Sequence, residues 1–264
     1  MKKLILALLF LSASLFAKDI SSYLNGSYQS TDKVKSALSA NGFKVIGEYD
    51  AMGDAKHHVV VYTCPGLIKL ASKENRGFAA VQKVLVDSEK KNLVMTNPEY
   101  FMPAFLQDDN DPKIVAKVAS KLSAAFGTLK GGVSTLEDDD IAGFHFMMGM
   151  PYYEDMIEVA EGKDLAATLE KNAKGKIVFT QKAGNATVYG IAMPKLEKTY
   201  VTTINAGAHA AFLPYMVMIQ GDKAVILHGK YYLAISNPTL SMGDFMGISS
   251  TPDDIEEQIT ALFK

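Results

Sequence analysis

The chain has 264 residues, of which 48% are apolar, and its formal net charge is −2. Because positive and negative charges nearly cancel, the sequence lacks the basic surface that nucleic-acid-binding proteins need, so we expect no nucleic-acid partner. The apolar fraction is typical of a packed globular protein, and a single cysteine, Cys64, excludes an internal disulfide.

Residues 1–17 have the pattern of a secretory signal peptide. Lys2 and Lys3 precede an apolar run at residues 4–11, and small residues lead to Ala17, after which we expect cleavage. The run is too short to span a membrane, which takes about 20 residues. No later segment of the sequence has that length. We therefore predict a periplasmic or secreted protein with no membrane span after signal cleavage.

The elements predicted for residues 18–126 follow the order helix, strand, strand, helix, strand, strand, helix. An amphipathic helix that ends at Gly42 comes first. The second strand ends at Cys64, and Pro65 then suits the first turn of a helix. The remaining elements are strands at 43–49, 78–87 and 92–96, a helix at 66–74, and a final helix from Pro112.

Residues 154–264 repeat this order. A helix that ends at Gly175 is followed by two strands, and the second of these ends at Met193. The remaining elements are a helix from Lys195, strands at 212–220 and 223–236, and a final helix from Pro252. Residues 127–153 form the predicted linker, which holds glycines, an acidic run and the apolar segment FHFMMGMPYY.

The two halves also share short motifs. Asn97-Pro98 recurs 140 positions later as Asn237-Pro238, and we interpret each pair as the end of the last strand in its half. Cys64-Pro65 corresponds to Met193-Pro194. The other matches at the spacing of 140 are Met102 with Met242, Phe105 with Phe245, and Pro112 with Pro252. This repeat predicts an α+β fold of two similar tandem domains, each an antiparallel sheet with helices packed on one face.

Two segments of the first half resemble a known protein family. GFKVIGEYD and the stretch from VVVYTCPGLIKLA to MTNP give a Gly-Phe strand, a Pro-x-Leu helix, a strand pair and a terminal Asn-Pro. In this order the chain resembles the bacterial family catalogued as domain of unknown function 302, well over residues 32–98 and more loosely over 165–238. The resemblance implies a tandem arrangement of that domain. Val81 departs from the family, in which proline is frequent at this place, and Pro214 supplies that proline in the second half. The family has no settled catalytic residues, so the resemblance implies a fold and no particular activity.

Cys64 is the sharpest chemical candidate in the sequence. It lies at a predicted junction between a strand and a helix, and a helix N-terminus stabilises the negative charge of a thiolate. Such a thiolate could carry persulfide sulfur or bind a soft metal such as Cu(I). Free cysteines are also among the most buried residues. Because Met193 occupies the corresponding place, a packing role and a thioether metal ligand both stay open.

The segment FHFMMGMPYY is the second candidate. It holds His145, Met147, Met148 and Met150, and thioether and imidazole ligands together suit copper or haem iron. On a strand, His145 and Met147, or Met148 and Met150, would share a face. The alternative is that these methionines fill irregular gaps between the two halves. The sequence has no C-x-x-C-H motif, which excludes c-type haem attachment.

The remaining motifs indicate no particular chemistry. His57 and His58 precede a predicted strand. Adjacent residues on a strand face opposite ways, so we expect surface or capped histidines and no shared metal ion. A nucleophile elbow and a phosphate-binding loop are absent from the sequence. We therefore expect a periplasmic module that binds a small ligand or a soft metal, without catalysis, in the crevice between the halves.

Two questions stay open at this point. A thiol-dependent sulfur carrier or transferase that uses Cys64 is the alternative function, and whether the protein is an enzyme is undecided. Copper and haem are the cofactors that the candidate ligands would suit. A periplasmic protein partner is a further candidate, and neither the ligand nor the oligomeric state follows from the sequence.

Overall fold

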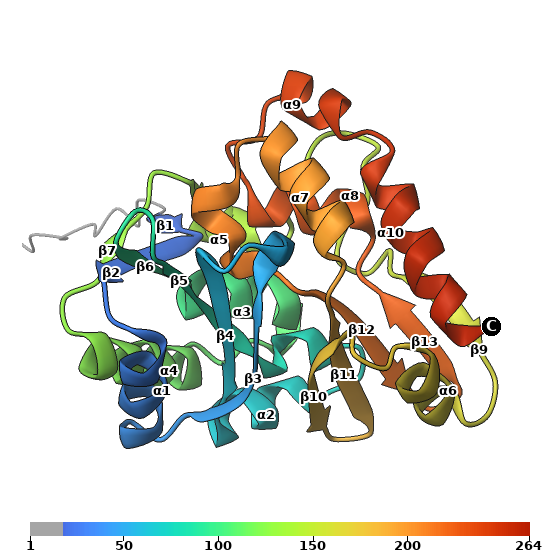
Figure 1. Ribbon diagram of the computed structural model, residues 1–264, viewed down its shortest axis with the longest axis horizontal. Coiled ribbons are helices and arrows are strands. Elements are labelled where there is room, and N and C mark those ends of the chain that lie inside the picture. The colour runs from blue at the N-terminus through green and yellow to red at the C-terminus, as the bar shows by residue number, and fades with distance from the viewer. Residues whose placement is uncertain (1–17) are drawn as a thin grey trace, which may run out of the picture.

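A computed structural model describes residues 18–264 of the chain. The expected signal peptide, residues 1–17, lies outside the described residues. Within them, no helix has the length and apolar character that crossing a membrane requires. The structure is built from two large antiparallel sheets and a small two-stranded one, flanked by helices (Figure 1), which confirms the predicted α+β class. The division into two tandem domains stays a prediction.

The first sheet has six strands in the order β3-β4-β5-β6-β2-β7. All neighbouring strands in it are antiparallel. Every residue of β5 is buried, so both faces of the sheet are covered at its centre. The strands are β3 (Lys44–Asp50), β4 (His57–Thr63), β5 (Gln82–Asp87), β6 (Asn92–Thr96), β2 (Tyr23–Ser27) and β7 (Lys130–Gly131).

The second sheet has five strands in the order β10-β11-β12-β13-β9. This order repeats that of β3-β4-β5-β6-β2, strand for strand. The strands are β10 (Ile177–Ala183), β11 (Ala186–Ile191), β12 (Tyr215–Gln220), β13 (Lys223–Ile226) and β9 (Ile157–Glu161). Strands β2 and β9, which hold the fifth place in the two orders, were not predicted from the sequence. Each lies before the first helix of its half, far along the chain from the strand that it pairs with.

The helices follow the same order in both halves, except that the second half has one more, α9. Asp111 starts α4 by accepting hydrogen bonds from the backbone N–H groups of Lys113 and Ile114. The first half contains α1 (Thr31–Ala40), α2 (Pro65–Ala71), α3 (Pro98–Leu106) and α4 (Pro112–Phe126), and the second contains α6 (Leu165–Asn172), α7 (Pro194–Thr203), α8 (Gly229–Ser236), α9 (Met242–Gly247) and α10 (Thr251–Thr260). The short 3-10 turns are η1 (Ala51–Gly53), η2 (Gly77–Ala80), η3 (Gln107–Asp109), η4 (Gly207–Phe212) and η5 (Ala261–Phe263).

The two halves interlock. Turn η2 of the first half packs on β10, β11 and β12, and its counterpart η4 packs on β4, β5 and β6. The edge strands β3 and β10 also touch, and a Cβ atom added at Gly47 would lie 2.2 Å from the carbonyl oxygen of Val178. Each edge strand has a register shift at this contact, between Val45 and Gly47 in one and between Ile177 and Phe179 in the other.

The predicted strand at residues 223–236 is wrong in its second part. Strand β13 ends at Ile226, and residues 229–236 form helix α8. All residues of α8 except Lys230 are buried. A helix that is apolar on all sides has no 3.6-residue period to distinguish it from a buried strand.

The interpretation of the Asn-Pro pairs is right for one half only. Asn97 follows β6 and begins α3, where its side chain accepts a hydrogen bond from the Glu99 N–H. Asn237 instead follows helix α8. The structural counterpart of Asn97 is His228, which follows β13 and accepts a hydrogen bond from the Lys230 N–H through Nδ1. The spacing of 140 does hold for Pro112 and Pro252, which both lie at the start of a helix.

The predicted linker, residues 127–153, is partly ordered into the fold. Strand β7 extends the first sheet, and β8 (Thr135–Glu137) pairs with β1 (Asp19–Ser21). Helix α5 (Asp138–Ile141) follows. The segment FHFMMGMPYY, residues 144–153, contains turns and no strand. The alternation that would have placed His145 with Met147 on one strand face therefore does not occur.

Candidate functional site

A cleft of about 230 Å³ opens where the β3–β4 hairpin tip of the first half meets α7 of the second. The two elements lie side by side in Figure 1. Helix α7 contributes Lys198, Val201 and Thr202. The other lining residues are Met52, Asp54 and His57 from the hairpin, and Asn205 and Gly207 from the segment after α7.

A buried carboxylate holds the two walls of this cleft together. Glu197 of α7 is fully buried. It accepts hydrogen bonds from the backbone N–H of Met52 at 2.9 Å and of Met193 at 2.9 Å, and from the Tyr49 hydroxyl at 3.3 Å. Burial raises the pKa of the Glu197 carboxyl, and these hydrogen bonds oppose that shift.

Glu197 also accounts for the backbone of Met52. This residue has φ 60° and ψ 10°, a left-handed conformation that a non-glycine residue rarely adopts. The conformation directs the Met52 N–H to the Glu197 carboxylate, 2.9 Å away. The hydrogen bond therefore fixes the hairpin tip against α7, which gives the cleft a preformed wall.

His57 presents a nitrogen to the cleft. Its Nδ1 lies 3.3 Å from Asp54 Oδ2, and its side chain is 12% exposed. The backbone N–H of Lys56, and then His57 itself, hold the pKa of Asp54 below its usual value. An ionised carboxylate only accepts, so the proton of a neutral His57 ring is on Nδ1.

In this neutral form the other ring nitrogen of His57, Nε2, is an acceptor. Within residues 18–264, His57 Nε2 makes no protein hydrogen bond. It faces Gly207, where an added Cβ atom would lie 3.8 Å away. A side chain larger than glycine at position 207 would narrow the space in front of Nε2. The cleft thus combines a hydrogen-bond acceptor, the ammonium of Lys198 and apolar surface from Met52 and Val201.

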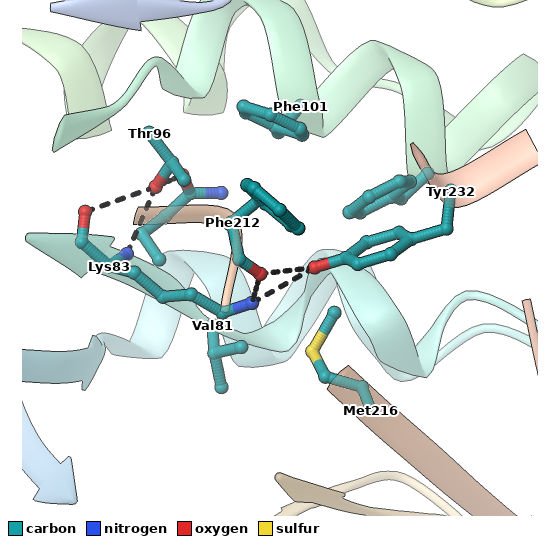
Figure 2. A pocket seen from close by; sticks show the side chains of 9 residues that line it. Val81, Lys83, Thr96, Phe101, Phe212, Met216 and Tyr232 are labelled. Carbon is teal, nitrogen blue, oxygen red and sulfur yellow. Dashed lines mark hydrogen bonds between the residues drawn. The ribbon is translucent and has the colours of Figure 1, made fainter. Parts of the chain in front are cut away.

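A second group of polar atoms lies deeper between the halves, around Lys83. Figure 2 shows the Lys83 side chain extending from β5 toward the Phe212 carbonyl oxygen and the Tyr232 hydroxyl. Its Nζ donates to the carbonyl oxygens of Phe212 at 2.5 Å and Pro214 at 3.2 Å, and to the Tyr232 hydroxyl at 3.1 Å. Burial lowers the pKa of Lys83 to about 7.

The Lys83 cavity is too small to be a ligand site. Its volume is about 10 Å³, which is roughly the space of one water molecule. Lys83 is the second residue of β5, and Met216 is the second residue of β12, the corresponding strand. Lys83 therefore links the two halves through hydrogen bonds, at a place where the second half has an apolar side chain.

Cys64 lines a separate groove of about 310 Å³ between α2 and α4. The residue is the N-cap of α2, as the sequence predicts, and is 2% exposed. Met193 is the N-cap of α7 and is also buried. Met193 does not line the Cys64 groove, so the structure does not bring these two sulfur residues into one cavity.

The candidate metal ligands of the linker lie on the surface. Met148 is 96% exposed and Met147 is 37% exposed. The ring of His145 lies 4.5 Å from the ring of Tyr152, centroid to centroid. Neither His145 nor Met150 lines the cleft or the Cys64 groove. In the described part of the chain, no group of three or more His, Cys, Asp or Glu side chains could hold a metal ion.

Comparisons of the chain with protein-family models, with curated proteins and with solved structures find no match. The resemblance to domain of unknown function 302 therefore stays a prediction. The function is inferred from the geometry of the sites.

The residues of the cleft were not predicted from the sequence. His57 was considered only together with His58, as a possible ligand of a metal ion. The available signal was Asp54, three positions before His57, at the end of a loop where its carboxylate can reach the ring. The sequence does not indicate that Lys198 and Glu197 belong to the cleft, because they come close to the hairpin only through the packing of the two halves.

Proposed function

We propose that this chain is an exported binding protein that holds a small molecule, without catalysis, in the cleft between its two halves. The observation that carries the proposal is the His57 Nε2 atom, which lies in a cavity of about 230 Å³ without a protein partner. Clefts at the junction of two structural units are frequent ligand sites. The hydrogen bonds of Glu197 across the junction favour a preformed site, which lowers the entropic cost of binding.

The lining residues define the chemistry of the ligand. His57 Nε2 accepts a hydrogen bond from a hydroxyl or amino group, and the exposed Lys198 ammonium pairs with an anion. Met52 and Val201 provide an apolar surface between them. A small hydroxycarboxylic or aminocarboxylic acid has these three features together, and we propose this class as the ligand.

The test uses lactate, malate, alanine and serine as probes with the chain that lacks residues 1–17. Nuclear magnetic resonance of the protein with ¹⁵N-labelled histidine follows Nε2 of His57 during each titration. We expect at least one probe to shift this resonance in a saturable way and to leave His145 unchanged. No saturable shift with any of the four would contradict the proposed ligand class.

A second candidate function is soft-metal binding at exposed methionines. Seven large apolar side chains are exposed within residues 18–264, and four of them are Met147, Met148, Met242 and Met246. The two segments that carry them meet where Phe146 stacks on Phe245, with ring centroids 4.8 Å apart. Thioethers are soft ligands for Cu(I), and exposed thioethers are prone to oxidation.

The metal test is a competition between the protein and bicinchoninate for Cu(I). Cys64 is replaced by serine in every variant, so that the thiol does not contribute. We expect the double variants M147L/M148L and M242L/M246L each to lower Cu(I) uptake, and Met156→Leu, outside the two segments, to leave it unchanged. Equal uptake in all variants would contradict a methionine site.

A further inference from the structure

The groove between α2 and α4 is distinct from the cleft. Its lining residues from the start of α2 are Cys64, Pro65, Gly66 and Lys69, and those from α4 are Ile114, Lys117, Val118 and Lys121. Gly66 allows the two helices to approach closely, because a Cβ atom added there would lie 3.3 Å from Ile114 Cγ2. The same atom would lie 3.8 Å from Cys64 Sγ. The thiol therefore lies beside the close approach of the two helices at Gly66.

The charge of the groove is entirely positive. Lys69, Lys117 and Lys121 line it, and no acidic residue does. In the described part of the chain none of these three lysines has a carboxylate within ion-pair distance, whereas Lys35, Lys56 and Lys223 each have at least one. Helices α2 and α4 contain no acidic residue at all. Since the whole chain has a net charge of −2, this concentration of positive charge is a local feature.

The positions of the three lysines direct their positive charges to the same cavity. Lys117 and Lys121 are four residues apart on α4, so they project from the same side of the helix. Lys69 faces them from α2 across the groove. Three like charges around one cavity repel one another, and a small anion between them removes that repulsion.

We propose that the α2–α4 groove binds a small anion with two or more negative charges, held by Lys69, Lys117 and Lys121 next to Cys64. This inference goes beyond the cleft ligand and does not depend on it. Because the lysines are at the surface, the attraction is salt-dependent. An anionic disulfide in the groove would meet the thiolate of Cys64. The thiolate sulfur forms a bond to one disulfide sulfur, the disulfide bond breaks, and the leaving thiolate takes the electron pair.

Cys64 makes this site measurable, because it is the only thiol in the chain. The experiment compares the rates at which two reagents modify Cys64 in the native protein at low salt. One reagent is the dianion 5,5′-dithiobis(2-nitrobenzoate), and the other is the neutral disulfide 4,4′-dithiodipyridine. The rate with the dianion divided by the rate with the neutral disulfide separates the effect of charge from the accessibility of the thiol.

We expect the ratio to fall about tenfold in the variant K117Q/K121Q, and to fall similarly in wild type when salt is raised to about 0.5 M. Lys113→Gln is the matched control, because Lys113 lies on the same helix outside the groove. Sulfate should protect Cys64 from the dianion more than chloride does at equal ionic strength.

Three results would overturn the proposal. The first is a ratio that changes no more in K117Q/K121Q than in Lys113→Gln. The second is a native protein in which neither reagent modifies Cys64, because the groove would then not reach the thiol. The third is equal protection by sulfate and chloride. His57→Leu removes the cleft acceptor and should leave the ratio unchanged, so failure of this proposal is distinguishable from failure of the cleft proposal.

Discussion

The ammonium nitrogen of Lys83 lies 2.5 Å from the carbonyl oxygen of Phe212. Lys83 is on β5 of the first half, and Phe212 ends the turn η4 that the second half packs onto the first sheet. The Tyr232 hydroxyl, from α8, also donates to this carbonyl oxygen. A buried lysine side chain therefore joins three elements at the junction of the halves.

This relationship predicts that the stability of the protein depends on pH through Lys83. Burial lowers the pKa of the folded side chain to about 7 from an ordinary value of 10.5. Between these pH values the unfolded chain binds the proton and the folded chain largely does not. The free energy of unfolding therefore rises as pH increases from 7 to about 10.5, by an amount on the order of 5 kcal/mol.

Lys83→Met provides the comparison, because methionine occupies the corresponding position 216 in the second half. The variant lacks the titrating group, so its unfolding free energy should rise less with pH than that of wild type. Urea unfolding of both proteins between pH 6.5 and 10 measures the difference. Parallel curves would show that Lys83 does not titrate between these pH values.

A second prediction concerns Glu197→Gln. The carboxylate accepts three hydrogen bonds, from the Met52 N–H, the Met193 N–H and the Tyr49 hydroxyl. The glutamine side chain has one oxygen and cannot accept all three. We expect unfolding to become easier by about 1–3 kcal/mol, and the hairpin tip to lose its fixed position. Amide hydrogen exchange at Met52 should become faster in this variant.

Glu257→Gln is the matched control, because Glu257 is an exposed residue of α10. It should change neither the unfolding free energy nor the exchange at Met52. Unchanged exchange at Met52 in Glu197→Gln would mean that the buried carboxylate does not hold the hairpin.

A third prediction concerns the contact between the edge strands. In Gly47→Ala the new Cβ atom would lie 2.2 Å from the Val178 carbonyl oxygen and 2.9 Å from Phe179 Cβ. Since the first of these neighbours is backbone, β3 and β10 must move apart, and we expect a loss of about 1–3 kcal/mol in unfolding free energy.

Gly143→Ala serves as the control for this substitution, because a Cβ atom at Gly143 meets nothing within 4 Å. Thermal unfolding of the two variants and wild type compares them directly. A midpoint for Gly47→Ala as high as that of Gly143→Ala would show that the strands are not in contact at this place.

The sequence predicts much of the local structure of this protein. The helix after Cys64-Pro65 and the helix after Met193-Pro194 follow from proline at the first helical turn. The strand runs around Val60 and Val188 follow from β-branched residues. Helix α8 could not be predicted, because its buried residues surround the helix and leave no periodic pattern.

The candidate site was harder to predict than the fold. The sequence indicated a crevice between the halves but not its residues, because Lys198 and His57 are brought together only by the packing of α7 on the β3–β4 hairpin tip. Only one part of the groove at Cys64 could be predicted from the sequence. Its thiol was expected at the start of a helix, whereas the three lysines become a cluster only when α4 packs on α2.

The most direct test of the central claim is a calorimetric titration of the cleft ligand in a double-mutant cycle. Lactate, malate, alanine and serine are titrated into wild type, His57→Leu, Lys198→Gln and the double variant, with Lys195→Gln as a control outside the cleft on the same helix. For the probe that binds, we predict about tenfold weaker affinity in each single cleft variant, which corresponds to about 1.4 kcal/mol, and unchanged affinity in Lys195→Gln. Affinity that is the same in His57→Leu and wild type, or no binding of any probe, would contradict a ligand held between the two halves.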